Sequence, residues 1–176
     1  MMRVIGGNHK GRILKRVGKK TTRETADMVK ESVFNMINGR EFKCVLDLFA
    51  GSGAYGLEAL SRGAHYLYAV DHDKDAIKCV FENARILDVA EHMTILQRDY
   101  KQFLKNIGNI YFDLVFIDPP YNLDIYDEVL NTLNDAVDQN GLIVVETSKK
   151  RVLDDTYKDL IKISVYYNYI CLILSY

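Results

Sequence analysis

The sequence predicts an α/β protein with a mostly parallel sheet of seven strands and helices on both faces of that sheet. From residue 44 onward, short apolar runs of strand length alternate with segments in which apolar residues recur at helical spacing. The strand runs are almost entirely apolar, which is typical of parallel strands buried on both faces. Two runs rich in aromatic and β-branched residues follow at about 160–166 and 169–174. They suit an antiparallel pair at the sheet edge, so the last strand is expected to run antiparallel.

The first 43 residues predict a β-hairpin and a helix that precede the sheet. Residues 2–6 and 12–16 have the composition of short strands, with glycines in the connecting turn. Apolar residues between Thr25 and Ile37 recur at helical spacing, and the pair Asn38-Gly39 ends that helix. We therefore expect an N-terminal extension over residues 1–43 and a larger domain over residues 44–176.

The larger domain is expected to alternate strands with helices. Besides the two C-terminal runs, its expected strands are residues 44–49, 66–70, 93–96, 114–117 and 142–145. Its expected helices are residues 54–62, 74–87, 100–107 and 125–137. Each helix then returns the chain to the start of the next strand, as parallel strands require.

The composition excludes several classes of protein. The chain has 176 residues, of which 48% are hydrophobic and 27% charged, close to the averages of a soluble globular domain. No apolar run approaches the roughly 20 residues that span a bilayer, and no secretory signal is evident. Three widely spaced cysteines and four scattered histidines show no metal-ligand spacing. We expect a cytoplasmic protein without a membrane partner and without a metal.

The charge is divided unevenly along the chain. Residues 1–43 contain 11 basic and 4 acidic residues, a net charge of +7, whereas residues 44–176 contain 12 and 20, a net charge of −8. A basic segment before an acidic domain is often a nucleic-acid-binding arm. A solvated basic tail would show the same pattern.

A glycine-rich turn follows the first strand of the larger domain. Gly51, Gly53 and Gly56 have the spacing of a nucleotide-binding turn, and Asp71 ends the next strand, where it could accept hydrogen bonds from ribose hydroxyls. This spacing also fits NAD enzymes. Asp47, which precedes the glycines, favours a ligand with an ammonium group such as S-adenosylmethionine over a pyrophosphate. Asp47 could instead cap the following helix.

The chain contains only two prolines, and both lie in the tetrapeptide from Asp118 to Tyr121. Pro119 and Pro120 donate no backbone N–H, so they fix an extended turn with carbonyl acceptors after the apolar strand. Acceptors from Asp118 and the Pro119 carbonyl suit methyl transfer to an exocyclic amino group, because they can stabilise charge that develops on its nitrogen. Tyr121 could stack on a base turned out of its helix or loop. The alternative is a rigid turn without catalytic function.

Asp99 ends another predicted strand, and two interpretations of it are open. Its side chain could bind the adenine amino group of a cofactor, or it could cap the helix that begins at Tyr100.

Taken together, these motifs resemble the bacterial RsmD family of 16S ribosomal RNA guanine-N2 methyltransferases. The resemblance runs almost end to end. It is carried by the segment from Asp47 to Ala64, the tetrapeptide from Asp118 to Tyr121, residues 3–7, 10–12, 22–23 and 27–35, the run from Gly141 to Glu146 and the strand closing at Tyr176.

The resemblance implies a Rossmann-like, class I methyltransferase fold and S-adenosylmethionine as the cofactor. The implied partner is 16S ribosomal RNA or a small-subunit assembly particle, and a monomer is expected. The expected catalytic residues are Asp118, Pro119, Pro120 and Tyr121. The expected cofactor-binding residues are Asp47, Phe49, Ala50, Gly51, Ser52, Gly53, Asp71, His72, Asp99 and Tyr100. The expected RNA-binding residues are Arg3, Lys10, Arg12, Lys15, Arg16 and Arg23.

Two positions depart from the family pattern. Glu24 stands where the family usually has proline, which places a carboxylate beside Arg23. Asn168 replaces a usual glycine before the last strand, and asparagine tolerates the positive φ that such a turn requires. Three other functions stay open at this point: an adenine-N6 methyltransferase, an NAD-dependent oxidoreductase and a non-catalytic RNA-binding module.

Overall fold

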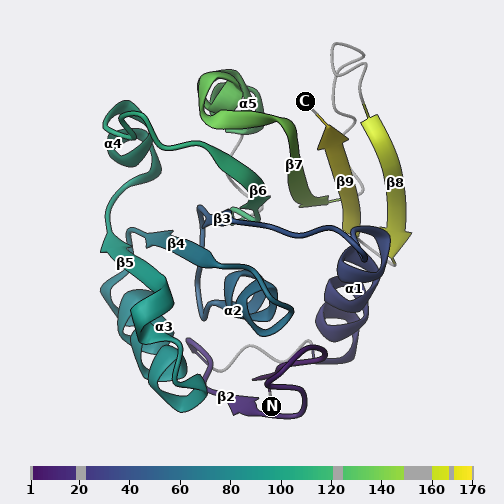
Figure 1. Ribbon diagram of the computed structural model, residues 1–176, viewed down its shortest axis with the longest axis vertical. Helices are drawn as coiled ribbons and strands as arrows, with labels where there is room; N and C mark the ends of the chain where they lie inside the picture. The colour runs from purple at the N-terminus through teal and green to yellow at the C-terminus, as the bar shows by residue number, and fades with distance from the viewer. Residues whose placement is uncertain (1, 19–22, 121–124, 149–159, 167–168, 176) are drawn as a thin grey trace.

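The computed structural model describes residues 2–18, 23–120, 125–148, 160–166 and 169–175. Its main sheet has seven strands in the order β5-β4-β3-β6-β7-β9-β8 (Figure 1). In chain order these strands are β3 (Cys44–Asp47), β4 (Tyr66–Asp71), β5 (Met93–Gln97), β6 (Phe112–Ile117), β7 (Val137–Ser148), β8 (Leu160–Tyr166) and β9 (Tyr169–Ser175). The first five of these strands pair in parallel, and β9 runs antiparallel to both of its neighbours. The fold class predicted from the sequence is confirmed.

Helices cover both faces of the sheet (Figure 1). Side chains of α1 (Arg23–Met36), α2 (Ala54–Ser61) and α3 (Lys74–Leu87) share one hydrophobic core with one face of the strands. Side chains of α4 (Tyr100–Lys105) and α5 (Tyr126–Leu133) share a second core with the other face. Successive strand residues alternate between the two cores, as Val45 and Leu46 do. Burial on both faces explains why the strands are almost wholly apolar.

The boundary between α5 and β7 differs from the sequence prediction. The predicted helix to Val137 ends at Leu133, a 3₁₀ turn follows over Asn134–Ala136, and β7 begins at Val137 instead of Leu142. The pairing of β7 with β6 shifts register early in the strand. A Cβ atom on Gly141 would lie 2.6 Å from Cγ1 of Val137, so the irregular start of β7 depends on glycine. A shift of this kind depends on the partner strand, and the local periodicity therefore did not predict it.

The predicted N-terminal hairpin is present, and it packs on the end of α2. β1 (Met2–Arg3) and β2 (Ile13–Leu14) pair antiparallel and are shorter than predicted. The connecting turn contacts Ser61, whose hydroxyl donates to the carbonyl of Gly6 at 2.6 Å. A Cβ atom on Gly7 would lie 1.8 Å from the Ser61 carbonyl oxygen, so this close approach requires glycine. In the described part of the chain, no helix has both the length and the apolar character needed to cross a membrane.

Candidate active site at the carboxyl edge of the sheet

A cavity of about 560 Å³ lies at the carboxyl ends of the central strands. This is where open α/β sheets bind their ligands. Its walls come from four parallel strands, from the glycine-rich turn and, unexpectedly, from the N-terminal segment and α1. The lining residues are Met2, Arg16, Val17, Asp27, Lys30, Asp47, Phe49, Ala50, Gly51, Ser52, Ala54, Tyr55, Asp71, His72, Asp73, Ala76, Asp118, Pro119, Pro120 and Glu146.

The strand register brings acidic residues together at this edge. Asp47 of β3 pairs with Phe116 of β6 in the parallel ladder, and Phe116 pairs with Val144 of β7. Because side chains alternate between faces, Asp118 and Glu146 follow two positions later on the same face as Asp47. The ends of three neighbouring strands thus direct carboxylates into one cavity.

Asp47 is buried beneath the glycine-rich turn. Its Oδ2 accepts a hydrogen bond from the backbone N–H of Gly56 at 3.0 Å, and the residue is only 3% exposed. Burial raises the pKa of Asp47 to about 7, and the charge of Asp71 adds to this effect, while the Gly56 hydrogen bond opposes it. Since Gly56 lies in the first turn of α2, Asp47 also satisfies a helix N–H, as the helix-capping interpretation suggested.

Asp118 has a raised pKa for related reasons. Burial is the main cause, and the nearby carboxylates of Glu146 and Asp47 add to it. Three carboxyl groups with few compensating cations disfavour further negative charge. A cationic or hydrogen-bond-donating ligand would relieve this repulsion.

The glycine-rich turn has the geometry that its spacing predicted. Gly51 and Gly53 both have positive φ, 53° and 79°, and the N–H of Gly51 donates to Oδ2 of Asp71 at 2.8 Å. At Gly56 a Cβ atom would lie 2.7 Å from Leu67 and 3.1 Å from the Asp47 carboxylate. A larger residue there would push α2 away from the sheet.

The N-terminal segment is bonded directly to this turn. The Ser52 hydroxyl accepts from the Val17 N–H at 2.9 Å. The buried side chain of Asn83 accepts from the Lys15 N–H at 2.7 Å and donates to the Lys15 carbonyl at 3.0 Å. The same amide nitrogen donates to the Ser52 carbonyl at 2.9 Å. One side chain of α3 therefore joins the basic segment to the cavity wall.

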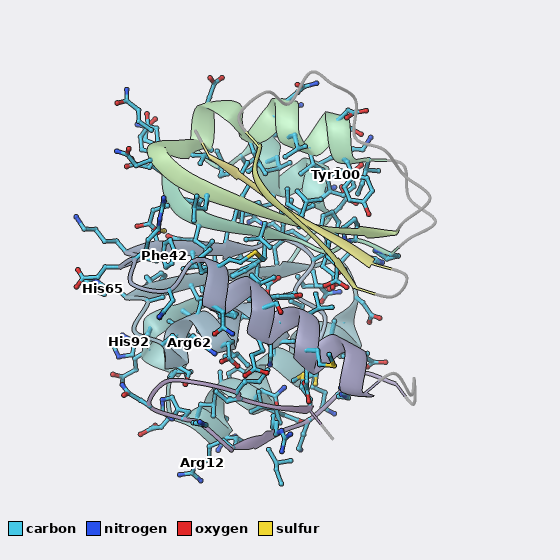
Figure 2. All side chains as sticks on the ribbon, turned by 90° about the vertical axis from the view of Figure 1, so that its right-hand side faces the viewer. Arg12, Phe42, Arg62, His65, His92 and Tyr100 are labelled. Atoms are coloured by element: carbon cyan, nitrogen blue, oxygen red, sulfur yellow. The ribbon has the colours of Figure 1, made fainter. Side chains whose placement is uncertain are left out.

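A buried ion pair joins the hairpin, α1 and α2. The ammonium group of Lys30 lies 3.3 Å from the Glu58 carboxylate and donates to the Arg3 carbonyl at 3.0 Å. Burial lowers the pKa of Lys30, against the opposing effect of Glu58. Glu58 also accepts from Nε of Arg62 at 2.8 Å, and Figure 2 shows Arg62 beside α1. This network places Lys30 in the cavity wall.

The structure brings most of the predicted site residues together. Those in the cavity wall are Asp47, Phe49, Ala50, Gly51, Ser52, Asp71, His72, Asp118, Pro119, Pro120 and Arg16. The described residues that lie outside the wall are Gly53, Asp99, Tyr100, Arg3, Lys10, Arg12 and Lys15. Tyr121 and the side chain of Arg23 lie outside the described part of the chain.

Two of the residues outside the wall have structural partners. Asp99 caps α4 by accepting from the Lys101 N–H at 2.9 Å, as one of its two interpretations predicted. The ring of Tyr100 packs against Phe49, with centroids 5.5 Å apart, and its hydroxyl donates to Glu128 at 3.2 Å. Figure 2 shows that Tyr100 lies at the opposite end of the molecule from Arg12. Contact of Asp99 and Tyr100 with a cofactor stays a prediction.

Sequence reasoning missed Glu146, Tyr55, Lys30 and Asn83. Glu146 could have been found, because it follows an apolar strand just as Asp71 and Asp118 do. No local sequence pattern indicates that Tyr55, Lys30 or Asn83 contributes to the site. Within the described residues, no group of His, Cys, Asp and Glu side chains could hold a metal ion.

The strand order and the acidic cavity at the carboxyl edge define a protein with the Rossmann-like fold of class I methyltransferases. The family model described as "Conserved hypothetical protein 95" matches residues 2–172. The chain belongs to this family, the RsmD family.

Known proteins agree with this assignment. The chain is 39% identical to "Putative rRNA methyltransferase YlbH" of Bacillus subtilis, over 91% of this chain and 90% of that protein. It is 35% identical to "Ribosomal RNA small subunit methyltransferase D" of Haemophilus influenzae, over 86% and 81% of the two chains. A solved structure of a hypothetical protein from Thermus thermophilus superposes with a TM-score of 0.85, at 25% identity and over the full length of both chains.

Proposed function

We propose that this protein transfers a methyl group from S-adenosylmethionine to the exocyclic N2 of a guanine in 16S ribosomal RNA. The N–CH3 bond forms as the S–CH3 bond breaks, so S-adenosylhomocysteine is the other product and N2 loses one proton. The observation that carries the proposal is the position of Asp118 and Pro119 in the same cavity as Asp47 and the glycine-rich turn. The names of the relatives support an RNA substrate in the small ribosomal subunit.

The cavity fits the proposed cofactor in size and charge. A volume of about 560 Å³ lies within the range of roughly 300–1,000 Å³ that is usual for small-molecule sites. S-adenosylmethionine supplies a transferable methyl group on a positively charged sulfur and also has an ammonium group. Asp47 would pair with that ammonium group, and Asp71 would accept from the ribose hydroxyls. Phe49, His72 and Asp99 would surround the adenine.

Asp118 and Pro119 would then act on the guanine. The lone pair of the guanine amino group is delocalised into the ring, which makes its nitrogen a poor nucleophile. The Asp118 carboxylate and the Pro119 carbonyl can accept its two hydrogens, favour the pyramidal nitrogen and stabilise the positive charge that develops on it. The base must leave its stack to reach the cavity, and Tyr121 is predicted to stack on it.

The basic N-terminal segment would bind the RNA. Arg16 in the cavity wall and Arg12 on the hairpin would contact phosphates near the flipped base, together with Arg3, Lys10, Lys15 and Arg23. The substrate is proposed to be 16S ribosomal RNA or a small-subunit assembly particle. We further propose that the protein acts as a cytoplasmic monomer.

Substitution of Asp118 tests the catalytic assignment. We expect Asp118→Ala to lower the turnover of labelled S-adenosylmethionine with unmethylated small subunits by at least about 100-fold, because the acceptor for the reacting amino group is lost. Cofactor binding, measured by calorimetry, should persist. Asp135→Ala, at an exposed position after α5, is the matched control. Near-normal turnover of Asp118→Ala would reject the proposed role.

Nucleoside mass spectrometry of the product separates the alternative functions. N2-methylguanosine supports the proposal, whereas N6-methyladenosine would favour the adenine enzyme. Calorimetric binding of NAD without binding of S-adenosylmethionine would favour an oxidoreductase. Salt-dependent RNA binding without any turnover would indicate a binding module.

A further inference from the structure

Glu146 lies next to Asp118 at the carboxyl edge of the sheet. β6 and β7 pair in parallel, with Ile117 opposite Val145, so the next residue of each strand is Asp118 and Glu146 respectively. Both residues line the cavity, and the charge of Glu146 contributes to the raised pKa of Asp118. The site therefore presents two neighbouring carboxylates.

The Glu146 carboxylate is positioned by rigid neighbours. Its Oε2 accepts a hydrogen bond from the Tyr55 hydroxyl at 2.8 Å, and its backbone carbonyl accepts from the Tyr126 hydroxyl at 3.3 Å. The Tyr55 ring is stacked on Phe116, with centroids 5.0 Å apart, and on Phe34 at 6.5 Å. Aromatic packing in the core thus limits the directions in which the Glu146 carboxylate can point.

Two adjacent acceptors match the edge of guanine better than that of adenine. In guanine the N2 amino group lies beside N1–H, so both groups donate hydrogen bonds. In adenine the N6 amino group lies beside N1, which carries no hydrogen and accepts. A carboxylate next to the acceptor for the amino group would attract guanine N1–H and repel the lone pair of adenine N1.

We propose that Glu146 accepts the N1–H of the target guanine and is the residue that makes the site specific for guanine. The proposal rests on the proposed function, because it requires the N2 amino group at Asp118. Glu146 reads the base, while Asp118 and Pro119 act on the reacting nitrogen.

The base analogue 2-aminopurine tests this assignment. It keeps the 2-amino group, but it lacks O6 and its N1 accepts a hydrogen bond instead of donating one, so the contact at N1 is read from the change that a Glu146 variant makes in the preference. Once the methylated guanine has been mapped, the small-subunit RNA can be ligated around a synthetic oligonucleotide that carries guanine or 2-aminopurine at that position. We expect wild-type kcat/KM to favour guanine by about 100-fold or more, because 2-aminopurine leaves a carboxylate facing a lone pair.

Glu146→Gln is the decisive variant, since its amide can rotate and donate to N1 of 2-aminopurine. We expect the preference for guanine to fall by at least about tenfold, with KM for guanine RNA raised more than kcat is lowered. The fluorescence of 2-aminopurine, which rises when the base unstacks, should report tighter binding of the analogue RNA to Glu146→Gln than to wild type without any turnover. Calorimetric affinity for S-adenosylmethionine should stay within about twofold.

Two further variants exclude a merely structural effect. Glu91→Gln, at an exposed position before β5, should keep the wild-type preference. Tyr55→Phe removes the bond to Glu146 but keeps its carboxylate, so KM should rise while guanine stays preferred. An unchanged preference in Glu146→Gln, with N2-methylguanosine still formed by wild type, would overturn the role of Glu146 alone. Absence of N2-methylguanosine from the wild-type product would overturn the proposed function as well.

Discussion

At the scale of single residues, Asp47 shows how burial can prepare a site for a cation. The residue is 3% exposed and has a pKa of about 7, so at neutral pH roughly half of the molecules carry a protonated Asp47 before any ligand binds. A ligand ammonium group would stabilise the ionised form and lower this pKa. Binding of such a ligand must therefore release protons near neutral pH.

This argument predicts a pH dependence of cofactor affinity. Only ionised Asp47 can pair with the ammonium group, and its ionised fraction rises from about 3% at pH 5.5 to about 50% at pH 7.0. We expect the affinity for S-adenosylmethionine to increase roughly 15-fold over this interval, as measured by calorimetry. Measurements stop at pH 7.0 because α-amino groups lose their own proton near a pH of about 8.

Asp47→Asn separates Asp47 from the other titratable groups of the cavity, which include Asp71, His72, Asp118 and Glu146. The amide cannot ionise, so the variant should bind more weakly at pH 7.0 and show a much flatter dependence on pH. A dependence as steep as that of wild type would assign the titration to one of the other groups.

At the scale of secondary-structure elements, α3 does more than cover the sheet. Its residue Asn83 is completely buried and bonds the backbone of Lys15 as well as the Ser52 carbonyl. The glycine-rich turn is thereby held from two sides, by Asp71 of β4 and by the N-terminal segment.

Removal of the Asn83 amide should affect both stability and binding. Asn83→Ala removes the hydrogen-bond partner of part-buried backbone groups of Lys15 and Ser52 and empties a buried site, which costs about 1–3 kcal/mol in the free energy of unfolding. Urea denaturation measures this loss, and calorimetry should show weaker binding of S-adenosylmethionine because the turn is less well held. Asn131→Ala, on the exposed face of α5, should change the free energy of unfolding by less than about 0.5 kcal/mol. Equal urea midpoints for Asn83→Ala and wild type would show that this contact contributes nothing.

The elements also show which features the sequence could predict. The glycine spacing predicted the turn, because a turn depends on residues close together in the chain. The strand-end aspartates predicted the acidic edge, because the carboxyl ends of parallel strands lie at one edge of the sheet. The contact between Asn83 and Lys15 spans 68 positions, and neither residue has a local pattern that indicates it. The start of β7 at Val137 likewise depends on pairing with β6. These two features depend on packing between residues far apart in the chain, so the local sequence did not predict them.

At the scale of the whole molecule, the basic N-terminal segment and the acidic domain meet at one cavity. Arg16, Asp27 and Lys30 share its wall with Asp47 and Asp118. Residues on both sides of the sequence division at residue 43 therefore line the same cavity. RNA bound by the basic segment would lie directly beside the proposed active site.

The last prediction concerns the contribution of that segment to RNA binding. Lys10 and Arg12 are exposed, Arg16 is half-buried at the cavity, and Lys15 forms an ion pair with Glu82 at 2.9 Å. Each phosphate contact contributes about 0.7–0.9 to the slope of log affinity against log salt concentration. Substituting Lys10, Arg12 and Arg16 by Gln together should weaken RNA binding and reduce that slope by about 2–3. Lys15→Gln alone should reduce the slope by less than the loss of an unpaired basic residue, because Glu82 competes with phosphate for Lys15. The triple variant Lys78→Gln, Arg85→Gln and Lys105→Gln, on the exposed surfaces of α3 and α4, is the charge-matched control, and its slope should stay near that of wild type.

Titrations of labelled small-subunit RNA at several salt concentrations give all four slopes. Equal slopes for wild type and the N-terminal triple variant would mean that the basic segment is solvated charge, and that RNA reaches the acidic edge by another surface.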